Sequence, residues 1–216
     1  GIKTYRIKGR GSLGILLVIN VGIGHIPFAL GKHAVYTPVD KDFVIIKASE
    51  GNGYKDPRLD QHYNAVKKAK KLYGFYHYAR PDLGNTPEAE ADWFLSLVGH
   101  HAGNCIYALD WEGASLNYPE TWALKWCLRV QEKTGVKPLI YCSASDVYKM
   151  RILYMYDFGL WVAHWGVYRP VFRGYPTWAI WQYQGSPLDS NVFNGDRRAW
   201  KAYCTSKPLS EVKDDG

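Results

Sequence analysis

Short apolar runs alternate with amphipathic stretches from residue 42 onward. The run 42–48 is rich in β-branched residues and predicts a buried strand, and the Gly-Asn-Gly sequence at 51–53 predicts a turn after it. Between residues 60 and 71 the small apolar side chains recur at helical spacing. The pattern therefore predicts a strand, a loop and a helix in that order.

The same alternation repeats along the next seventy residues. Thr86 followed by Pro87 has the sequence of a helix start, and Gly135 is placed to end a helix over 119–134. Between these helices, strands are predicted over 73–78, 106–111 and 138–142. Strands separated by helices favour parallel pairing in one sheet.

The pattern changes after residue 159. Two further strands are predicted over 159–163 and 177–183, and the connection between them is rich in Gly and Pro rather than helical. A chain that begins with regular strand and helix units and ends rich in strands predicts an α/β fold. We expect a TIM-like (β/α) barrel with an irregular, β-rich second half.

Residues 1–36 form an atypical N-terminal segment. Four basic residues among the first ten precede an apolar stretch over 14–21, which is the order of a secretion signal. The stretch also has the length of a strand, and we predict a buried strand over 15–21, the first of the barrel. Residues 37–205 are expected to form the rest of the barrel, and 206–216 a polar tail.

Composition and charge narrow the function classes. The chain has 216 residues, 47% of them hydrophobic, which fits one folded domain, and no apolar run approaches the ~20 residues of a membrane span. The net charge of +7 favours an anionic polymer as partner. The sequence lacks the motifs of nucleic-acid binding, so no nucleic acid is expected as a partner. No membrane is expected either, since no apolar run is long enough to span one. The acidic polymers of a bacterial wall suit the positive charge.

Four cysteines lie at 105, 127, 142 and 204, without the spacing of a metal site. We expect no metal and no cofactor. Buried thiols are the favoured interpretation, and a disulfide is the alternative. His77 and His164 are expected to be structural.

Two acids end the strand predicted over 106–111. Because side chains two apart on a strand point the same way, Asp110 and Glu112 are expected to share one face at the carboxyl end of the barrel, where barrel enzymes hold their active sites. Such a pair suits glycoside cleavage, in which one carboxyl donates a proton and another negative group stabilises a positive transition state. The alternative is that both carboxylates lie on a solvated rim and have no catalytic role.

Seven segments together resemble family 25 glycoside hydrolases, the N-acetylmuramidase type of lysozyme that includes phage endolysins and bacterial autolysins. They are 42–51, 76–81, 108–112, 138–141, 160–165, 181–184 and 189–191. The resemblance covers roughly residues 40 to 204. It implies hydrolysis of the β-1,4 bond between N-acetylmuramic acid and N-acetylglucosamine in bacterial peptidoglycan, by a monomer in the extracellular space or cell wall, secreted or released by phage lysis.

The resemblance also assigns roles to residues. Glu112 matches the family's general acid, and Asp110 matches the carboxylate that orients the 2-acetamido group and stabilises an oxazolinium-like intermediate, which retains the anomeric configuration. Substrate binding is expected of Asp189, Tyr76, Tyr141, Trp165 and Gln182.

One departure concerns the first strand. Family members carry an Asp there, about sixteen residues before the position of Asp42, whereas Ile26 occupies that offset and residues 1–39 contain neither Asp nor Glu. The alternative function is therefore a non-catalytic peptidoglycan-binding protein that lost this acid. A shift of reading frame in the recorded sequence would also account for the difference, and peptide sequencing of residues 1–36 tests it.

Overall fold

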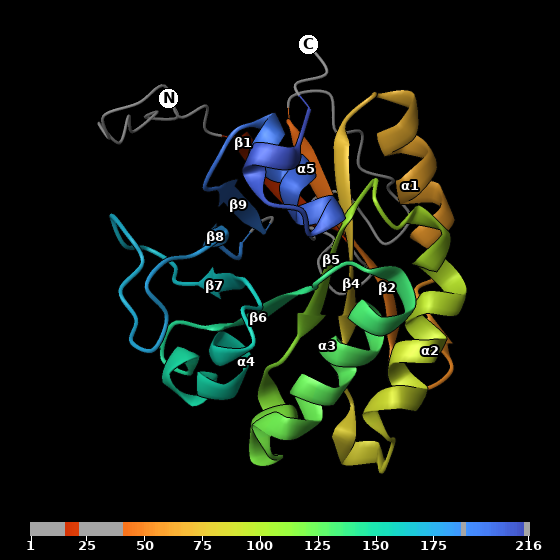
Figure 1. Cartoon of the computed structure of the whole chain (residues 1–216), viewed down its shortest axis with the longest axis vertical. Coiled ribbons are helices and arrows are strands. Elements are labelled where there is room, and N and C mark those ends of the chain that lie inside the picture. Colours follow the sequence, from red (N-terminus) through yellow and green to blue (C-terminus); the bar gives the residue numbers. More distant parts are fainter. Residues whose placement is uncertain (1–15, 22–40, 187–188, 214–216) are drawn as a thin grey trace.

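The computed structural model describes residues 16–21, 41–186 and 189–213. The expectations for Ile26, for the acid that it replaces and for the domain boundary at residue 36 lie outside these ranges. Within them the chain forms a mixed α/β fold in which helices pack around one curled sheet (Figure 1).

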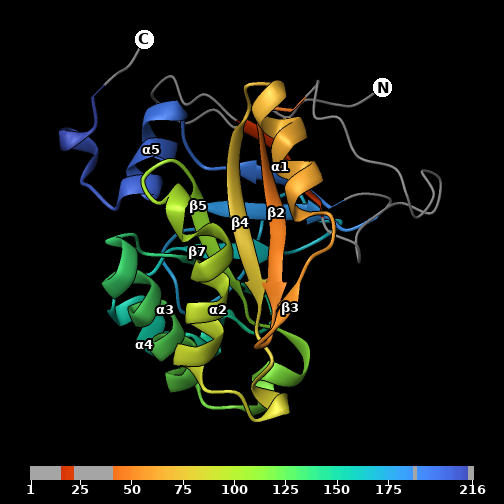
Figure 2. The ribbon, with the colours of Figure 1, turned by 90° about the vertical axis from the view of Figure 1, so that its right-hand side faces the viewer.

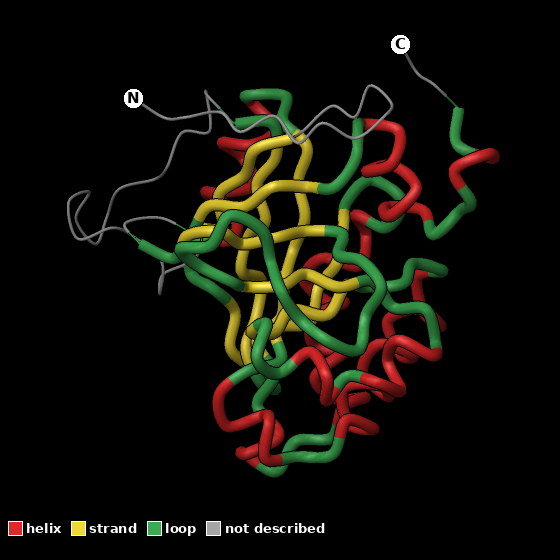
Figure 3. The backbone as a smooth tube through the Cα atoms, turned by 90° about the vertical axis from the view of Figure 1, so that its left-hand side faces the viewer, coloured by secondary structure: helices red, strands yellow, loops and turns green. Residues whose placement is uncertain are grey.

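The sheet orders its strands β1-β9-β8-β7-β6-β5-β4-β2-β3, and β1 also pairs with β2. Figure 3 shows these strands gathered into one curled body. The strands are β1 (Leu16–Val21), β2 (Phe43–Glu50), β3 (Tyr54–Lys55), β4 (Leu72–Tyr78), β5 (Ile106–Asp110), β6 (Leu139–Ser143), β7 (Leu160–Ala163), β8 (Ile180–Gln184) and β9 (Ser190–Phe193). From β1 through β2 and β4 to β8 each neighbouring pair is parallel, so their carboxyl ends meet at one edge.

Five α-helices occur in the described ranges: α1 (Leu59–Lys68), α2 (Pro87–Val98), α3 (Glu120–Thr134), α4 (Arg151–Met155) and α5 (Arg197–Thr205). Figure 2 shows α1 and α2 beside β2 and β4. Alternation along β2 explains this layering, because Val44 and Ile46 pack in the outer core with the helices, whereas Phe43 and Ile45 pack in a separate inner core. A strand buried on both faces reads as a continuous apolar run.

The local signals at the helix ends are confirmed. The Thr86 hydroxyl accepts a hydrogen bond from the amide of Ala89 at 3.2 Å, with Pro87 as the first residue of α2. Gly135 ends α3 with φ at 73°, a conformation that glycine adopts without strain. The strands predicted from residue 42 to 183 are also confirmed, with ends that differ by at most three residues.

The second half differs from a regular TIM barrel. Strand β9, which the sequence pattern does not predict, runs antiparallel to both β1 and β8. The connection over 164–179 between β7 and β8 contains no helix. The regular eightfold repeat of parallel strand and helix is therefore not present in the described part of the chain, and the coarser expectation of an α/β fold with a β-rich second half is confirmed.

Candidate active site

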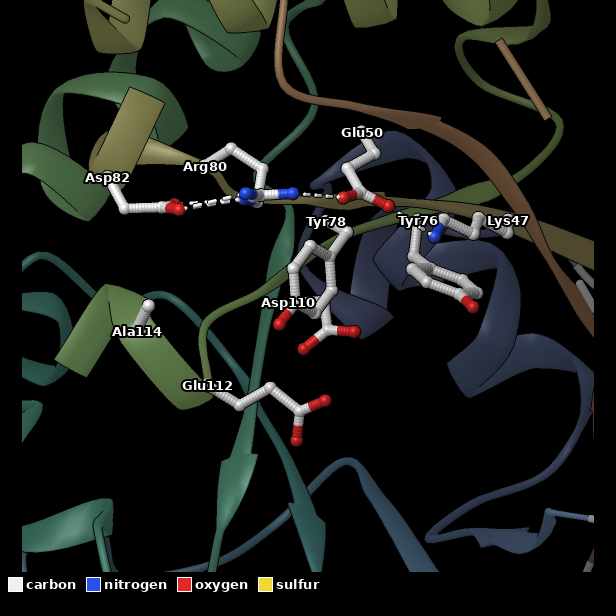
Figure 4. Close-up of a pocket in the computed structure, with 9 residues that line it drawn as sticks. All are labelled: Lys47, Glu50, Tyr76, Tyr78, Arg80, Asp82, Asp110, Glu112 and Ala114. Carbon is white, nitrogen blue, oxygen red and sulfur yellow. Dashed lines mark hydrogen bonds and ion pairs between the residues drawn. The ribbon is translucent and has the colours of Figure 1, made fainter. Parts of the chain in front are cut away.

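Asp110 and Glu112 share one pocket at the carboxyl end of β5. The backbone stays extended through Glu112, with φ at −144° and ψ at 180°, so the two side chains project to the same side. Figure 4 shows both carboxylates facing the same open space, a pocket of about 370 Å³. The prediction that the two carboxylates share one face at the carboxyl end of β5 is thus confirmed.

Asp110 is the more deeply placed acid of the pair. It lies beside Tyr78 of β4 and Tyr141 of β6 in the sheet register and is 6% exposed. Burial raises the pKa of Asp110 well above its ordinary value, and the nearby Glu112 carboxylate raises it further against the attraction of Lys47. A negative charge on Asp110 is therefore costly despite the attraction of Lys47.

A narrower pocket continues from the first. The two share Tyr76, Asp110 and Glu112 as lining residues, so they adjoin, and we call them together the cavity. The narrower part is also lined by Tyr141, Trp161, Gln182 and Asp189. The structure therefore brings together six of the seven residues that the sequence indicated for the site.

Two polar groups of this narrower part, whose volume is only about 10 Å³, bear on ligand binding. The Gln182 Oε1 atom accepts hydrogen bonds from the Tyr141 hydroxyl at 3.0 Å and from the Trp165 indole at 2.9 Å, which fixes the Gln182 amide. The buried Tyr76 hydroxyl has no hydrogen-bond partner among the described residues. Because buried hydroxyl groups are normally paired, Tyr76 is available to a bound molecule.

Trp165 is the seventh predicted residue, and it lies beside the cavity rather than in it. Its side chain is 57% exposed, and it does not line either pocket. Its link to the site is the hydrogen bond to Gln182.

One wall of the larger pocket is a chain of alternating charges that the sequence analysis missed. Lys47 donates to Glu50 at 2.8 Å, and Arg80 donates to Glu50 at 2.7 Å and to both Asp82 oxygens (Figure 4). Burial opposes ionisation of Glu50, but the hydrogen bonds from Lys47 and Arg80 outweigh it and lower the pKa. A signal was present, since Lys47 and Glu50 are polar residues at the end of an apolar strand.

A buried hydrogen-bonded chain supports this wall from behind. The His77 Nδ1 atom lies 2.8 Å from the Ser49 hydroxyl, and its Nε2 atom lies 2.7 Å from the Glu90 carboxylate. All three side chains are buried. Glu90 also accepts a hydrogen bond from the backbone amide of Arg80 at 3.1 Å, which ties the chain to the pocket.

Other expected features concern metals, membranes and thiols. In residues 16–21, 41–186 and 189–213 no cluster of three or more His, Cys, Asp or Glu side chains is arranged to hold a metal ion. No helix in these ranges has the length and hydropathy to cross a membrane. The four cysteines are buried free thiols, as the favoured interpretation predicted.

Comparison with known sequences connects this site to a family. The sequence model of glycosyl hydrolases family 25 matches residues 33–192. Lysozyme M1 of Streptomyces globisporus is 33% identical over 177 residues, which are 71% of this chain and 60% of that protein. The chain therefore spans less than two thirds of the length of this curated relative.

Solved structures show the same similarity. The bacterial lysozyme from Streptomyces coelicolor superimposes with a TM-score of 0.72 and 29% identity, over 89% of this chain and 98% of that one. A modular endolysin solved in complex with a peptidoglycan analogue superimposes with a TM-score of 0.58 and 25% identity, over 83% of this chain and 54% of that one.

Proposed function

The chain belongs to family 25 of the glycosyl hydrolases, and on this premise we propose that it is a lysozyme of the N-acetylmuramidase type. It hydrolyses the β-1,4 bond between N-acetylmuramic acid and N-acetylglucosamine in bacterial peptidoglycan. The observation that carries the proposal is the placement of Asp110 and Glu112 in one cavity together with Asp189. The relatives named lysozyme and the endolysin with a bound peptidoglycan analogue support the substrate.

Glu112 is the proposed general acid. It gives its proton to the glycosidic oxygen, the bond from that oxygen to the anomeric carbon breaks, and the leaving sugar departs with a free hydroxyl group. The carbonyl oxygen of the 2-acetamido group forms the new bond to the anomeric carbon, which gives an oxazolinium-like intermediate. Glu112, now a carboxylate, takes a proton from water, and the water oxygen bonds to the anomeric carbon as the bond from that carbon to the acetamido oxygen breaks. The result is overall retention, by the substrate-assisted route known among glycosidases.

Asp110 stabilises the positive charge that develops on the sugar. Its negative charge is costly because burial and Glu112 both raise the pKa of Asp110. A cationic transition state offsets that cost, whereas a neutral substrate does not, so Asp110 binds the transition state better than the ground state. This difference accelerates the chemical step.

The remaining polar groups of the narrower pocket bind the sugar. Asp189 lies beside the acid pair, and Tyr76 offers a buried hydroxyl without a partner among the described residues. Tyr141 and Gln182 form a hydrogen-bonded unit whose position is fixed by the sheet. These groups are proposed to orient the ring and its acetamido substituent for attack.

The setting of the activity follows from the substrate. We infer a monomer that acts in the extracellular space or on the cell wall, after secretion or phage lysis. We also infer that its curled sheet is an irregular variant of the TIM barrel. The alternative of a non-catalytic wall-binding protein is not favoured, because Asp110, Glu112 and Asp189 all line one cavity. Like charges brought together at such cost favour a catalytic role.

Clearing of purified cell walls tests the proposal. The protein is expected to clear a wall suspension and to release fragments that end in reducing N-acetylmuramic acid, as read by mass spectrometry. Glu112→Gln keeps the shape but has no proton to donate, and we expect a loss of at least ~1000-fold. The matched control is Glu211→Gln at an exposed position. Binding without clearing, or fragments that end in reducing N-acetylglucosamine, would contradict the assignment.

A further inference from the structure

The connection between β7 and β8 presents an unusual number of apolar side chains to solvent. Trp165, Val167, Tyr168 and Val171 are 57%, 36%, 72% and 65% exposed. Single exposed apolar residues are common on protein surfaces, but several in one short segment mark a binding surface.

The neighbouring segment adds two more aromatic rings. Tyr148 in the 3-10 helix η6 (Val147–Lys149) is 61% exposed and Tyr154 in α4 is 44% exposed. The connection packs against both, since the rings of Tyr154 and Tyr175 lie 5.2 Å apart and the backbone at Gly174 approaches that of Tyr148. Figure 1 shows the light blue connection next to α4. We call the six residues Tyr148, Tyr154, Trp165, Val167, Tyr168 and Val171 the aromatic surface.

The aromatic surface begins at the edge of the cavity. The Trp165 indole donates to Gln182 at 2.9 Å, and Gln182 lines the narrower pocket. The amide of Val171 donates to the His164 Nδ1 atom at 3.1 Å, which folds the connection back toward the end of β7. The Trp165 indole therefore links the aromatic surface directly to a residue that lines the cavity.

The same two segments carry exposed cations. Arg169 and Arg173 lie in the connection, and Arg151 begins α4. No described residue forms a salt bridge with any of the three, whereas the adjacent Lys149 is held by Asp146 at 2.7 Å. The surface thus combines flat rings with cations available to an anionic ligand.

We infer that the aromatic surface is a second binding site for the peptidoglycan strand, on the side of the cavity where Trp165 contacts Gln182. The inference rests on the proposed function and deepens it. The apolar faces of successive sugars lie on Trp165 and Tyr168, and the carboxylates of the stem peptides pair with Arg169 and Arg173. A second copy of this chain is a poor occupant, because two identical cationic surfaces repel each other.

The test separates binding along the strand from chemistry in the cavity. The variant is Tyr168→Ala with Arg173→Ala, and the matched control is Leu209→Ala with Arg197→Ala, an exposed apolar residue and an exposed cation at the C-terminal side. Each protein is assayed on insoluble cell walls and on a soluble, peptide-free tetrasaccharide of alternating N-acetylglucosamine and N-acetylmuramic acid. We expect kcat/KM on walls to fall about tenfold in the variant only, with the tetrasaccharide rate unchanged.

Sedimentation with cell walls gives a readout that does not need turnover. In a Glu112→Gln background, the Tyr168→Ala and Arg173→Ala variant is expected to bind walls about tenfold more weakly than the control. Equal binding and equal wall activity in the two proteins overturn the inference, and so does a parallel loss on walls and tetrasaccharide. The inference is also overturned if the variant binds duplex DNA or anionic vesicles more weakly than the control does but binds walls equally well. Failure of the wild-type protein to cleave either substrate refutes the proposed function instead, while sedimentation still decides on the surface.

Discussion

The His77 imidazole and the Glu90 carboxylate lie 2.7 Å apart, and both side chains are fully buried. Burial lowers the pKa of His77, although the hydrogen bond to Glu90 acts in the opposite direction, so the neutral imidazole is favoured. Because a carboxylate only accepts hydrogen bonds, the proton of the neutral ring resides on Nε2, and Nδ1 accepts from Ser49. The hydrogen bonds of His77 to Ser49 and Glu90 thus connect β2, β4 and α2 behind the cavity.

Loss of the Glu90 carboxylate is expected to destabilise the fold. Glu90→Ala leaves the His77 ring, the Arg80 amide and the Asn85 side chain without their acceptor. Removal of one partner from a buried, hydrogen-bonded set costs about 3 kcal/mol of unfolding free energy. Urea unfolding measures the loss, and Glu88→Ala at an exposed position of the same helix is the control, with a change within about 0.5 kcal/mol. Equal midpoints for the two variants would refute the supporting role.

Buried histidines are expected to make stability depend on pH. Burial, assisted by His100, lowers the pKa of His101 from 6.5 to about 4, so the unfolded chain binds a proton in this interval that the folded chain does not. Stability from this group is therefore complete above pH 6.5 and is lost as the pH falls to about 4. The wild type should have a larger unfolding free energy than His101→Gln at pH 6.5, and this difference should decrease as the pH falls to about 4. Burial also lowers the pKa of His62, so His62→Gln should behave alike. A difference that stays constant with pH would contradict the argument.

Local periodicity predicted the strands and the position of the acid pair, because both depend on residues close in sequence. Asp110 and Glu112 are two residues apart on one extended segment, so their common direction follows from strand geometry alone. Strand β9 was missed because four residues with a short alternation give a weak signal.

The residues in the charged wall of the cavity and behind it could not be paired from the sequence. Glu50 and Arg80 are thirty residues apart, and His77 and Glu90 are thirteen apart in different elements. Their contacts depend on the register of β2 against β4, which shifts between Lys47 and Ser49. A polar residue in a strand shows that a partner is needed but does not identify it.

Arg80 is expected to position the charged wall through the planar geometry of its guanidinium group. It holds Asp82 through Nε and Nη2 and Glu50 through Nη1. Lysine keeps the positive charge but lacks this fork, so Arg80→Lys should raise KM on cell walls severalfold and leave kcat nearly unchanged. Arg129→Lys is the matched control, because Arg129 also bridges two carboxylates, Asp92 and Glu132, but on the outer helices. A fall in kcat with constant KM would place Arg80 in the chemistry rather than in binding.

Asp110→Asn is expected to lower activity and raise stability together. The amide keeps the shape of the carboxyl but brings no negative charge to a developing cation, so kcat on cell walls should fall on the order of 100-fold. Removing a buried charge should increase the unfolding free energy at neutral pH by roughly 1 kcal/mol. The sign follows from linkage, since a carboxyl whose folded pKa is raised loses stability as the pH rises from 3.8 through the folded value. The gain should therefore vanish as the pH falls toward 3.8, where both forms of residue 110 are neutral. Denaturant titrations of wild type and variant at a series of pH values measure this difference. A variant that is less stable than the wild type at pH 7, or equally active, would show that the charge at Asp110 is neither costly nor used.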